Sequence, residues 1–286
     1  MADMVWLASY PKSGNTWLRV LLANYQHDGP APIDINAIDV SLMASTRLWF
    51  DEWVGIEASA LDDDTIDTLR PGVYRCMAGA RSERQFVKTH DCWSRVASGE
   101  PMFPADVTHG VVYALRNPLD VVASLANHYG QSADEALTML CSEESQLARS
   151  TGQLAPQLRQ RLGGWSSDAG SWLDQSRLPA LVVRYEDLKA DTAGWLTRVL
   201  EFCEVEVDTA RVAKAVAFSS FEEMQRQERA GGFRERLAVN TGTFFRRGRS
   251  GGWREELTAE QVARLIAAHG PMMQRFGYLD AAGQPR

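Results

Sequence analysis

The chain has 286 residues, of which 45% are hydrophobic and 23% charged, and its formal net charge at pH 7 is −7. This length can bury a sizeable core in one large α/β domain or in two small ones, and the composition excludes global disorder. The acidic balance argues against a nucleic-acid binder, which usually carries a basic face, so any anion site has to be a local cluster of cations.

The cysteines and the hydropathy pattern indicate a cytoplasmic protein. The four cysteines are widely spaced and form no CxxC pair, so we expect reduced thiols and neither a disulfide framework nor a structural zinc site. The N-terminus has no basic stretch followed by an apolar core and a cleavage site. No run of about 18 apolar residues occurs, so we expect no transmembrane segment.

The first predicted elements are a strand, a tight loop and a helix. Residues 5–10 are apolar and β-prone, Pro11–Thr16 form a loop with one lysine and one glycine, and residues 17–24 have a helical pattern. In α/β proteins this order places the amides of a helix N-terminus against a phosphate or sulfate, and Lys12 adds a full positive charge. The loop alone is equally compatible with an ordinary βα turn that carries an exposed lysine.

The rest of the chain alternates between apolar strands and helices. We expect strands at 85–90, 111–115 and 181–185, and helices near 36–49, 64–69, 118–129 and 193–203. Asn117 is a plausible helix cap, and Pro118 suits the first helical turn. Continuous apolar strands separated by helices are typical of a parallel sheet covered on both faces, so the fold class is α/β.

Two polar segments, 131–176 and 231–243, have no strong apolar period. They are candidates for lids that face an acceptor, and solvated connections are an equally good interpretation. We treat residues 1–286 as a single domain that contains both segments.

The details of the first loop select one class of anion site. A Walker A loop needs two glycines followed by Lys and Ser/Thr, and here Lys12 precedes the only glycine. The string PKSGNTW instead resembles the 5′-phosphosulfate loop of sulfotransferases that use 3′-phosphoadenosine 5′-phosphosulfate (PAPS). Asn15 stands where that family usually has Thr. The resemblance implies a P-loop-like sulfotransferase fold, with a central parallel sheet flanked by helices, and cofactor contacts from Lys12, Ser13, Gly14, Asn15, Thr16 and Trp17.

Two further segments resemble the 3′-phosphate site of the same family. YALRNPLDVVAS places Arg116 at a strand end and Ser124 on the following helix, where a bidentate guanidinium and a hydroxyl can converge on one phosphate. FFRRGRSGGW is similar to the family's C-terminal loop. By that resemblance Arg246, Arg247 and the amide of Gly248 close over the 3′-phosphate, with Arg247 in place of the usual Lys.

The segment Lys88-Thr89-His90 ends an apolar strand. In the resembling family KTH lies beside the transferred group, and its histidine is the general base, a role that suits an imidazole with an unperturbed pKa near 6.5. The resemblance therefore makes His90 the base, with Lys12 and Lys88 stabilising developing charge. The other histidines lack this setting, and His128 is a distant second candidate; the others are His27, His109 and His269.

Two weaker matches concern the adenine. RYEDL and FSSFEEM resemble segments whose Tyr and Phe contact the base, which implies cofactor-binding roles for Tyr185, Ser220 and Phe221. Tyr185 would hydrogen-bond the adenine, while Trp17 and Phe221 would stack on it. Core packing is the alternative for these aromatic residues.

Together these matches predict transfer of a sulfuryl group from PAPS to a hydroxyl of a small-molecule or natural-product acceptor, such as a secondary metabolite. The product nucleotide is 3′-phosphoadenosine 5′-phosphate (PAP), and neither a metal nor a nucleic acid takes part. Two alternatives stay open: a P-loop nucleotide kinase-like enzyme and a non-catalytic adenine-nucleotide-binding module. The oligomeric state is also open, because only Thr258 of the family's dimer signal KxxxTVxxxE is identical here.

Overall fold

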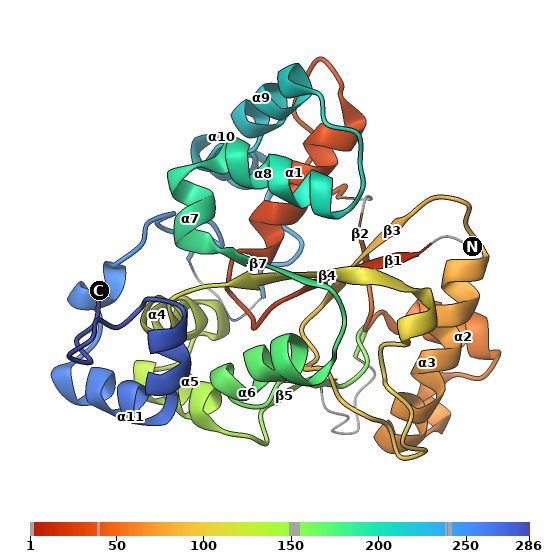
Figure 1. Ribbon diagram of the computed structural model, residues 1–286, viewed down its shortest axis with the longest axis horizontal. Helices are drawn as coiled ribbons and strands as arrows, with labels where there is room; N and C mark the ends of the chain where they lie inside the picture. Colours follow the sequence, from red (N-terminus) through yellow and green to blue (C-terminus); the bar gives the residue numbers. More distant parts are fainter. Residues whose placement is uncertain (1–2, 39–40, 149–154, 238, 240–241) are drawn as a thin grey trace. The chain divides into compact units, whose positions relative to one another are not determined.

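The computed structural model describes the chain apart from residues 1–2, 39–40, 149–154, 238 and 240–241 (Figure 1). The strands are β1 Met4–Ala8, β2 Ser41–Met43, β3 Gln85–Thr89, β4 Thr108–Leu115, β5 Gln146–Leu147, β6 Gln160–Arg161 and β7 Ala180–Arg184. The α-helices are α1 Asn15–His27, α2 Arg47–Val54, α3 Asp63–Gly79, α4 Pro118–Tyr129, α5 Ala133–Cys141, α6 Trp165–Gly170, α7 Tyr185–Ala190, α8 Thr192–Phe202, α9 Thr209–Phe218, α10 Phe221–Gly231 and α11 Ala259–Arg275. Short 3₁₀ turns lie at Ala58–Ala60, Ala105–Val107 and Gly252–Glu255, and one π-helical turn at Ser171–Gln175. None of the helices described is long and apolar enough to span a membrane.

A five-stranded sheet has the strand order β2-β3-β1-β4-β7. β1 pairs in parallel with both β3 and β4, and β2 pairs in parallel with β3. Every residue of β1 and β3 is buried, as expected for central strands of a sheet covered on both faces. The register places Ala8 beside Thr89 and Tyr113, so the segments that follow β1 and β3 leave the sheet at the same edge. The expected α/β fold with a central parallel sheet is confirmed.

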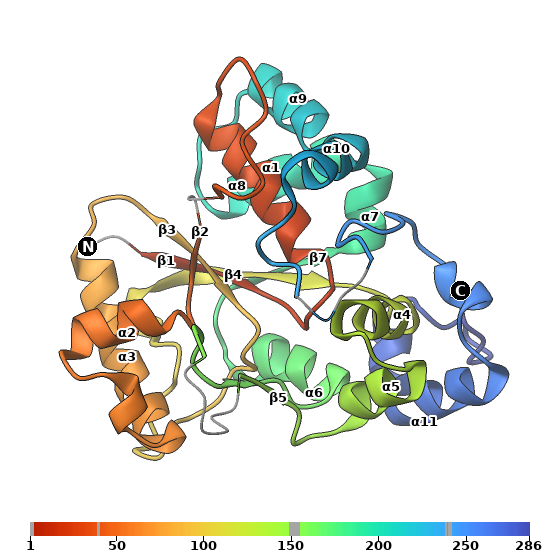
Figure 2. The same ribbon diagram turned by 180° about the vertical axis from the view of Figure 1, so that it is seen from behind.

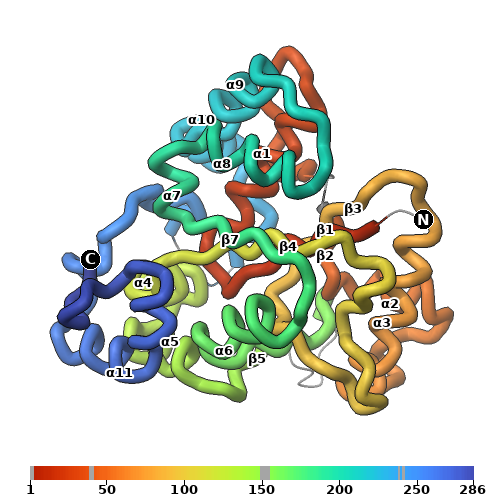
Figure 3. Tube along the Cα trace, viewed as in Figure 1, coloured from red at the N-terminus to blue at the C-terminus, as the bar shows by residue number. Residues whose placement is uncertain are grey.

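The chain divides into two compact units, each built from three stretches of sequence that can be followed in Figure 3. The first unit comprises residues 1–10, 41–113 and 143–182; the second comprises 11–40, 114–142 and 183–286. β4 and β7 begin in the first unit and end in the second. A single domain over 1–286 stays a prediction.

Aromatic rings fill the core of the first unit. Trp6 of β1 makes edge contacts with Tyr74 of α3 and with Phe103, at ring-centroid distances of 5.0 and 4.8 Å, and Phe103 meets Trp172 at 4.6 Å. The indole N–H of Trp6 donates to Thr108 Oγ1 over 2.9 Å, so its one polar atom is satisfied. Such rings bury a large apolar area and keep a fixed geometry, which gives the strands a rigid support.

The second unit is mainly helical. α1 packs beside α9 and α10, and α4 packs against α5 and α11 (Figure 2). Asn24 of α1 donates its side-chain amide to Ser219 Oγ over 3.0 Å and accepts from the Ile33 amide over 3.0 Å. This buried side chain therefore fixes the nearby segment at Ile33 and the distant segment at Ser219 against α1.

Several local predictions are confirmed, and two are wrong. Asn117 Oδ1 accepts from the Leu119 amide, and α4 begins at Pro118 as expected. A helix over 36–49 is wrong, because residues 41–43 form β2 and α2 begins only at Arg47; pairing with β3 overrides the weak helical period. The helix expected at 64–69 is too short, since α3 runs over Asp63–Gly79 with Pro71 inside it.

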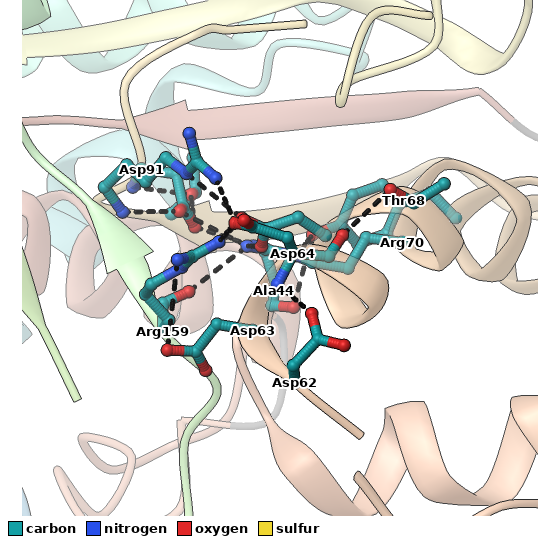
Figure 4. Close-up of polar contacts among 12 residues, drawn as sticks. Ala44, Asp62, Asp63, Asp64, Thr68, Arg70, Asp91 and Arg159 are labelled. Carbon is teal, nitrogen blue, oxygen red and sulfur yellow. Dashed lines mark hydrogen bonds and ion pairs between the residues drawn. The ribbon is translucent and has the colours of Figure 1, made fainter. Parts of the chain in front are cut away.

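A buried ion-pair cluster joins α3 to the end of β3 (Figure 4). Arg70 Nη2 lies 2.6 Å from Asp91 Oδ2, and Arg70 Nη1 lies 3.3 Å from Asp67 Oδ1. Arg159 adds ion pairs to Asp64 and Asp67. Removing one partner of a buried pair of this kind typically costs about 3–5 kcal/mol, because a charge is left uncompensated. The cluster thus holds the residue directly after His90.

Asp168 of α6 is a fully buried carboxyl group in the first unit. Its Oδ1 accepts the hydroxyl hydrogen of Tyr113, whereas Oδ2 has no hydrogen-bond partner within the described parts of the chain. Burial raises the pKa of Asp168 from its ordinary value of 3.8 to about 8; the Tyr113 hydrogen bond opposes the rise, and the charge of Asp91 adds to it. The carboxyl is therefore mostly protonated at neutral pH.

We predict that Asp168→Asn removes a pH-dependent loss of stability. Between about pH 4 and pH 8 the folded chain keeps a proton on Asp168 that the unfolded chain has lost, so the free energy of unfolding falls as pH rises through this window. Asparagine keeps the acceptor for Tyr113 and has no proton to lose. Thermal unfolding should show the wild-type Tm falling relative to the variant Tm from pH 5 to pH 9; parallel profiles would contradict the assignment.

Candidate active site

The loop between β1 and α1 has a backbone that few residues tolerate. Lys12 has φ 67° and Gly14 has φ 102°, both in the left-handed region. A Cβ on Gly14 would lie 2.9 Å from Cδ2 of the Tyr185 ring, so glycine is needed for close approach as well as for its φ. No side chain caps the N-terminus of α1. The first amides of this helix are therefore in a position to bind an anion.

The loop side chains add donors to these amides. Ser13 is 1% exposed, and its Oγ has no hydrogen-bond partner in the described chain. A buried hydroxyl without a partner is unfavourable unless a ligand supplies one. Lys12 Nζ lies 3.4 Å from the centre of the Phe244 ring, which holds the ammonium group by a cation–π contact. Asn15 is buried at the start of α1, and Thr16 Oγ1 lies 3.4 Å from Glu235 Oε2.

Arg116, directly after β4, connects the loop to two other segments of the second unit. It donates to the Lys12 carbonyl over 3.3 Å and to the Arg249 carbonyl over 3.2 Å. Its guanidinium carbon lies 4.4 Å from the centre of the Tyr185 ring. Ser124 lies in the second turn of α4 and is half-buried. Arg116 thus contacts both the Lys12 loop and the arginine-rich segment directly.

The arginine-rich segment is paired with two glutamates that the sequence analysis did not single out. Arg246 contacts Glu256 through both of its terminal nitrogens at 2.9–3.0 Å, and Arg247 Nη1 lies 2.6 Å from Glu256 Oε1. Arg249 pairs with Glu255, and this hydrogen bond lowers the pKa of the exposed Glu255 carboxyl. The sequence signal that could have identified these two glutamates is their position directly after Trp253 and Arg254, close to the arginines.

Asp120 fixes the backbone that follows the arginine-rich segment. Its carboxylate oxygens accept from the amides of Gly251 and Trp253 over 2.7 and 3.0 Å. Asp120 is the acidic residue of RNPLD, so the motif that supplies Arg116 also supplies the group that fixes the arginine-rich segment.

The expected adenine residues also have structural partners. Trp17 and Tyr185 meet edge to face at 5.7 Å, and the Trp17 indole N–H donates to the Ser219 carbonyl over 2.9 Å. Ser220 caps α10 by accepting from the Glu223 amide over 3.2 Å. Phe221 packs against the apolar cluster of the second unit that contains Met224 and Phe245. Ser220 and Phe221 thus have local structural roles beside any ligand role.

Lys88 and His90 belong to the first unit. Lys88 is buried in β3, and His90 follows the strand. The Nδ1 of His90 lies 2.8 Å from the Ser9 carbonyl oxygen and 3.3 Å from the Ser9 hydroxyl. Because the nearer partner is a carbonyl oxygen, which can only accept, we assign the hydrogen to Nδ1 and the lone pair to Nε2. This is the tautomer in which a histidine can take a proton through Nε2. His128, the second candidate, packs edge to face against Phe244 at 5.6 Å.

The family model described as "Sulfotransferase domain" matches residues 2–277. The chain belongs to this sulfotransferase family. Sulfuryl transfer is therefore the class of its reaction, as the motifs predicted, and the kinase-like alternative is not favoured.

Relatives with curated names agree with this assignment. Cytosolic sulfotransferase 12 of Arabidopsis thaliana is 27% identical, over 91% of this chain and 75% of its own. Flavonol 4′-sulfotransferase of Flaveria chlorifolia is 22% identical, over 92% of this chain and 77% of its own.

Among solved structures, a mouse sulfotransferase complexed with PAP has a TM-score of 0.60 at 18% identity, over 98% of this chain and 87% of its own. A retinol dehydratase in complex with androsterone and PAP has a TM-score of 0.63 at 18% identity, over 95% and 80%. At this level of identity the structures establish the fold.

We predict that Gly248→Ala destabilises the protein more than Gly277→Ala. Both glycines have positive φ, 57° and 71°, so both substitutions carry the same kind of backbone strain. Only at Gly248 would the new Cβ also meet a ring, 2.4 Å from Cδ2 of Phe221. Thermal unfolding should show a fall in Tm of a few degrees for Gly277→Ala and a clearly larger fall for Gly248→Ala. Equal shifts would mean that Phe221 does not pack on Gly248.

Proposed function

We propose that this enzyme transfers the sulfuryl group of PAPS to a hydroxyl group of a small-molecule acceptor and releases PAP. The observation that carries the proposal is the group of donors around Arg116 in the second unit. Arg116 contacts the loop that carries Lys12, the buried Ser13 hydroxyl and the uncapped start of α1. It also contacts the arginine-rich segment, at the Arg249 carbonyl. Two donor groups joined by one arginine suit a ligand with two separate anionic groups.

We assign the 5′-phosphosulfate to the loop and the 3′-phosphate to the other donors. The loop residues are Lys12, Ser13, Gly14, Asn15, Thr16 and Trp17. The 3′-phosphate residues are Arg116, Ser124, Arg246, Arg247 and Gly248. In the proposed complex the phosphate replaces Glu255 and Glu256 as the partner of the arginines, which are paired but one-third exposed. The fit rests on the donor set, since guanidinium, ammonium, hydroxyl and amide groups all bind phosphate oxygens.

The adenine is assigned to the aromatic residues of the second unit. Tyr185 and Trp17 already meet edge to face, and a flat purine can extend such an arrangement. Ser220 and Phe221 complete the proposed set at the start of α10.

In the proposed reaction, Nε2 of His90 takes the proton of the acceptor hydroxyl as its oxygen forms a bond to sulfur. The bond between sulfur and the bridging phosphate oxygen breaks, and PAP keeps the electron pair. Lys12 and the loop amides stabilise the charge that develops on this oxygen, and Lys88 stabilises the sulfuryl oxygens. Positioned donors of this kind contribute about 10²–10³-fold each. That the reaction needs no metal ion is a prediction from the sequence.

The acceptor is proposed from the relatives, whose names specify flavonols and luciferin. Flavonols carry phenolic hydroxyl groups, and a secondary metabolite with such a hydroxyl, modified in the cytoplasm, is the acceptor that we propose. Segments 131–176 and 231–243 remain proposed lids. Residues 149–154, 238, 240 and 241 of these segments lie outside the described residues.

We predict that His90→Asn and Arg116→Ala separate chemistry from binding. His90→Asn should lower turnover by at least about 10²-fold and leave PAP affinity within about two-fold, because the ring acts in proton transfer. Arg116→Ala should weaken PAP binding by about 10–100-fold. Transfer of labelled sulfate and calorimetry with PAP measure the two effects.

The control is Arg275→Ala, which removes an exposed arginine at the end of α11 in the same unit. It should bind PAP like the wild type. Near wild-type turnover in His90→Asn would overturn the role of His90, and unchanged PAP affinity in Arg116→Ala would overturn the 3′-phosphate assignment.

A further inference from the structure

One peptide group of the first unit lies between His90 and a second buried side chain. The Ser9 carbonyl accepts from His90 Nδ1 over 2.8 Å. In the pairing of β1 with β4, Tyr113 lies opposite Ala8, and its hydroxyl has a hydrogen bond with the backbone of Tyr10. Since this hydrogen bond lowers the pKa of the hydroxyl, the donor is the N–H of Tyr10, which belongs to the same peptide group. The C=O and N–H of a trans peptide point in opposite directions. His90 and Tyr113 therefore hold the Ser9–Tyr10 peptide from its two sides.

The hydroxyl of Tyr113 is in turn fixed by Asp168. A phenolic hydroxyl has one hydrogen to donate and can also accept. Since it accepts from the Tyr10 amide, its own hydrogen goes to Asp168 Oδ1. Ser9, Tyr10, Tyr113 and Asp168 are each at most 1% exposed. This assigns the direction of the hydrogen bonds that lead from the Asp168 carboxyl to the Ser9–Tyr10 peptide.

We propose that Tyr113 and Asp168 are positioning residues for His90, acting through the Ser9–Tyr10 peptide. This inference rests on the proposed function, in which His90 is the base. The peptide can accept from Nδ1 only while its plane keeps one orientation, and Tyr113 holds that plane from behind. If the peptide turned, His90 would lose its nearest acceptor, and the Ser9 hydroxyl, 3.3 Å away and able to donate to Nδ1, would no longer favour the lone pair on Nε2.

Burial makes this chain of hydrogen bonds effective. In a low-dielectric interior each hydrogen bond polarises the next, so donation from Tyr10 to Tyr113 makes the Ser9 carbonyl a better acceptor. Other titratable groups surround Asp168: Asp91 acts on its carboxyl, and Cys92, whose thiol pKa burial raises to about 12, is affected by Asp168, Asp91 and Arg161. The thiol therefore stays neutral, and the hydrogen bond that the Asp168 carboxyl accepts comes from Tyr113.

The direct test is Tyr113→Phe, which removes one oxygen and keeps the ring. A positioned base contributes about 10²–10⁴-fold, so loss of its orientation should lower kcat by about ten-fold or more. PAP affinity and the acceptor KM should stay within about two-fold, since neither ligand is assigned to Tyr113. Tyr25→Phe is the matched control: like the hydroxyl of Tyr113, its hydroxyl donates to an oxygen, here the Glu206 carbonyl, and accepts from a backbone amide, here that of Asp208. It should lose stability and keep its kcat.

A second pair of variants tests the same link if Tyr113→Phe folds poorly. Asp168→Asn keeps an acceptor oxygen for Tyr113 and should keep kcat within about three-fold at pH 7. Asp168→Ala removes that oxygen and should lower kcat like Tyr113→Phe. Recovery of kcat by the amide is an outcome that a purely structural role would not require.

The outcomes separate this inference from the proposed function. If His90→Asn is inactive while Tyr113→Phe and Asp168→Ala have wild-type kcat, the positioning role is overturned and the function stands. Parallel losses of kcat, PAP affinity and stability in Tyr113→Phe and Tyr25→Phe would also overturn it. If His90→Asn turns over normally, the proposed base itself fails.

Discussion

The proposed donor site depends on the contacts that the Arg116 side chain makes. Its guanidinium donates to the carbonyls of Lys12 and Arg249 and lies over the Tyr185 ring. Four parts of the second unit, distant in sequence, therefore meet at one side chain. An acidic chain needs such a device, because its positive charge must be concentrated locally to hold an anion. The positive φ of Lys12 and Gly14 and the uncapped start of α1 add donors to this place.

The same concentration of positive charge explains why two glutamates lie close to the arginines. Arg246 and Arg247 would repel each other and Arg249 without counter-ions, and Glu255 and Glu256 supply them. A bound 3′-phosphate has to compete with these carboxylates, so the arginines are held in place at some cost to ligand affinity. The first unit differs: His90 donates an uncharged hydrogen bond to the Ser9 carbonyl, and the charges lie on the neighbouring Arg70–Asp91 pair.

Structural elements that depend on neighbouring residues could be predicted from the sequence. Elements and contacts that depend on residues far away in the chain could not. The central strands and the Asn117 cap follow from patterns within a few residues, and the proposed site residues Lys12, His90 and Arg116 come from patterns of the same kind. β2 forms only by pairing with β3, more than forty residues away, so the local period indicated a helix. The bond between Tyr113 and Asp168 joins residues 55 apart, and no local pattern marks it. The spacing of RNPLD and FFRRG implied one phosphate, but only the structure gives the contacts of Arg116 and Asp120.

The central claim is that the second unit recognises a nucleotide by two separate anionic groups. Calorimetric titration of the wild-type protein with PAP and with adenosine 5′-phosphate tests it most directly, because the two ligands differ only in the 3′-phosphate. The account predicts that PAP binds at least about 100-fold more tightly, as expected for a phosphate held by several charge-assisted hydrogen bonds. Equal affinities for the two nucleotides would contradict it.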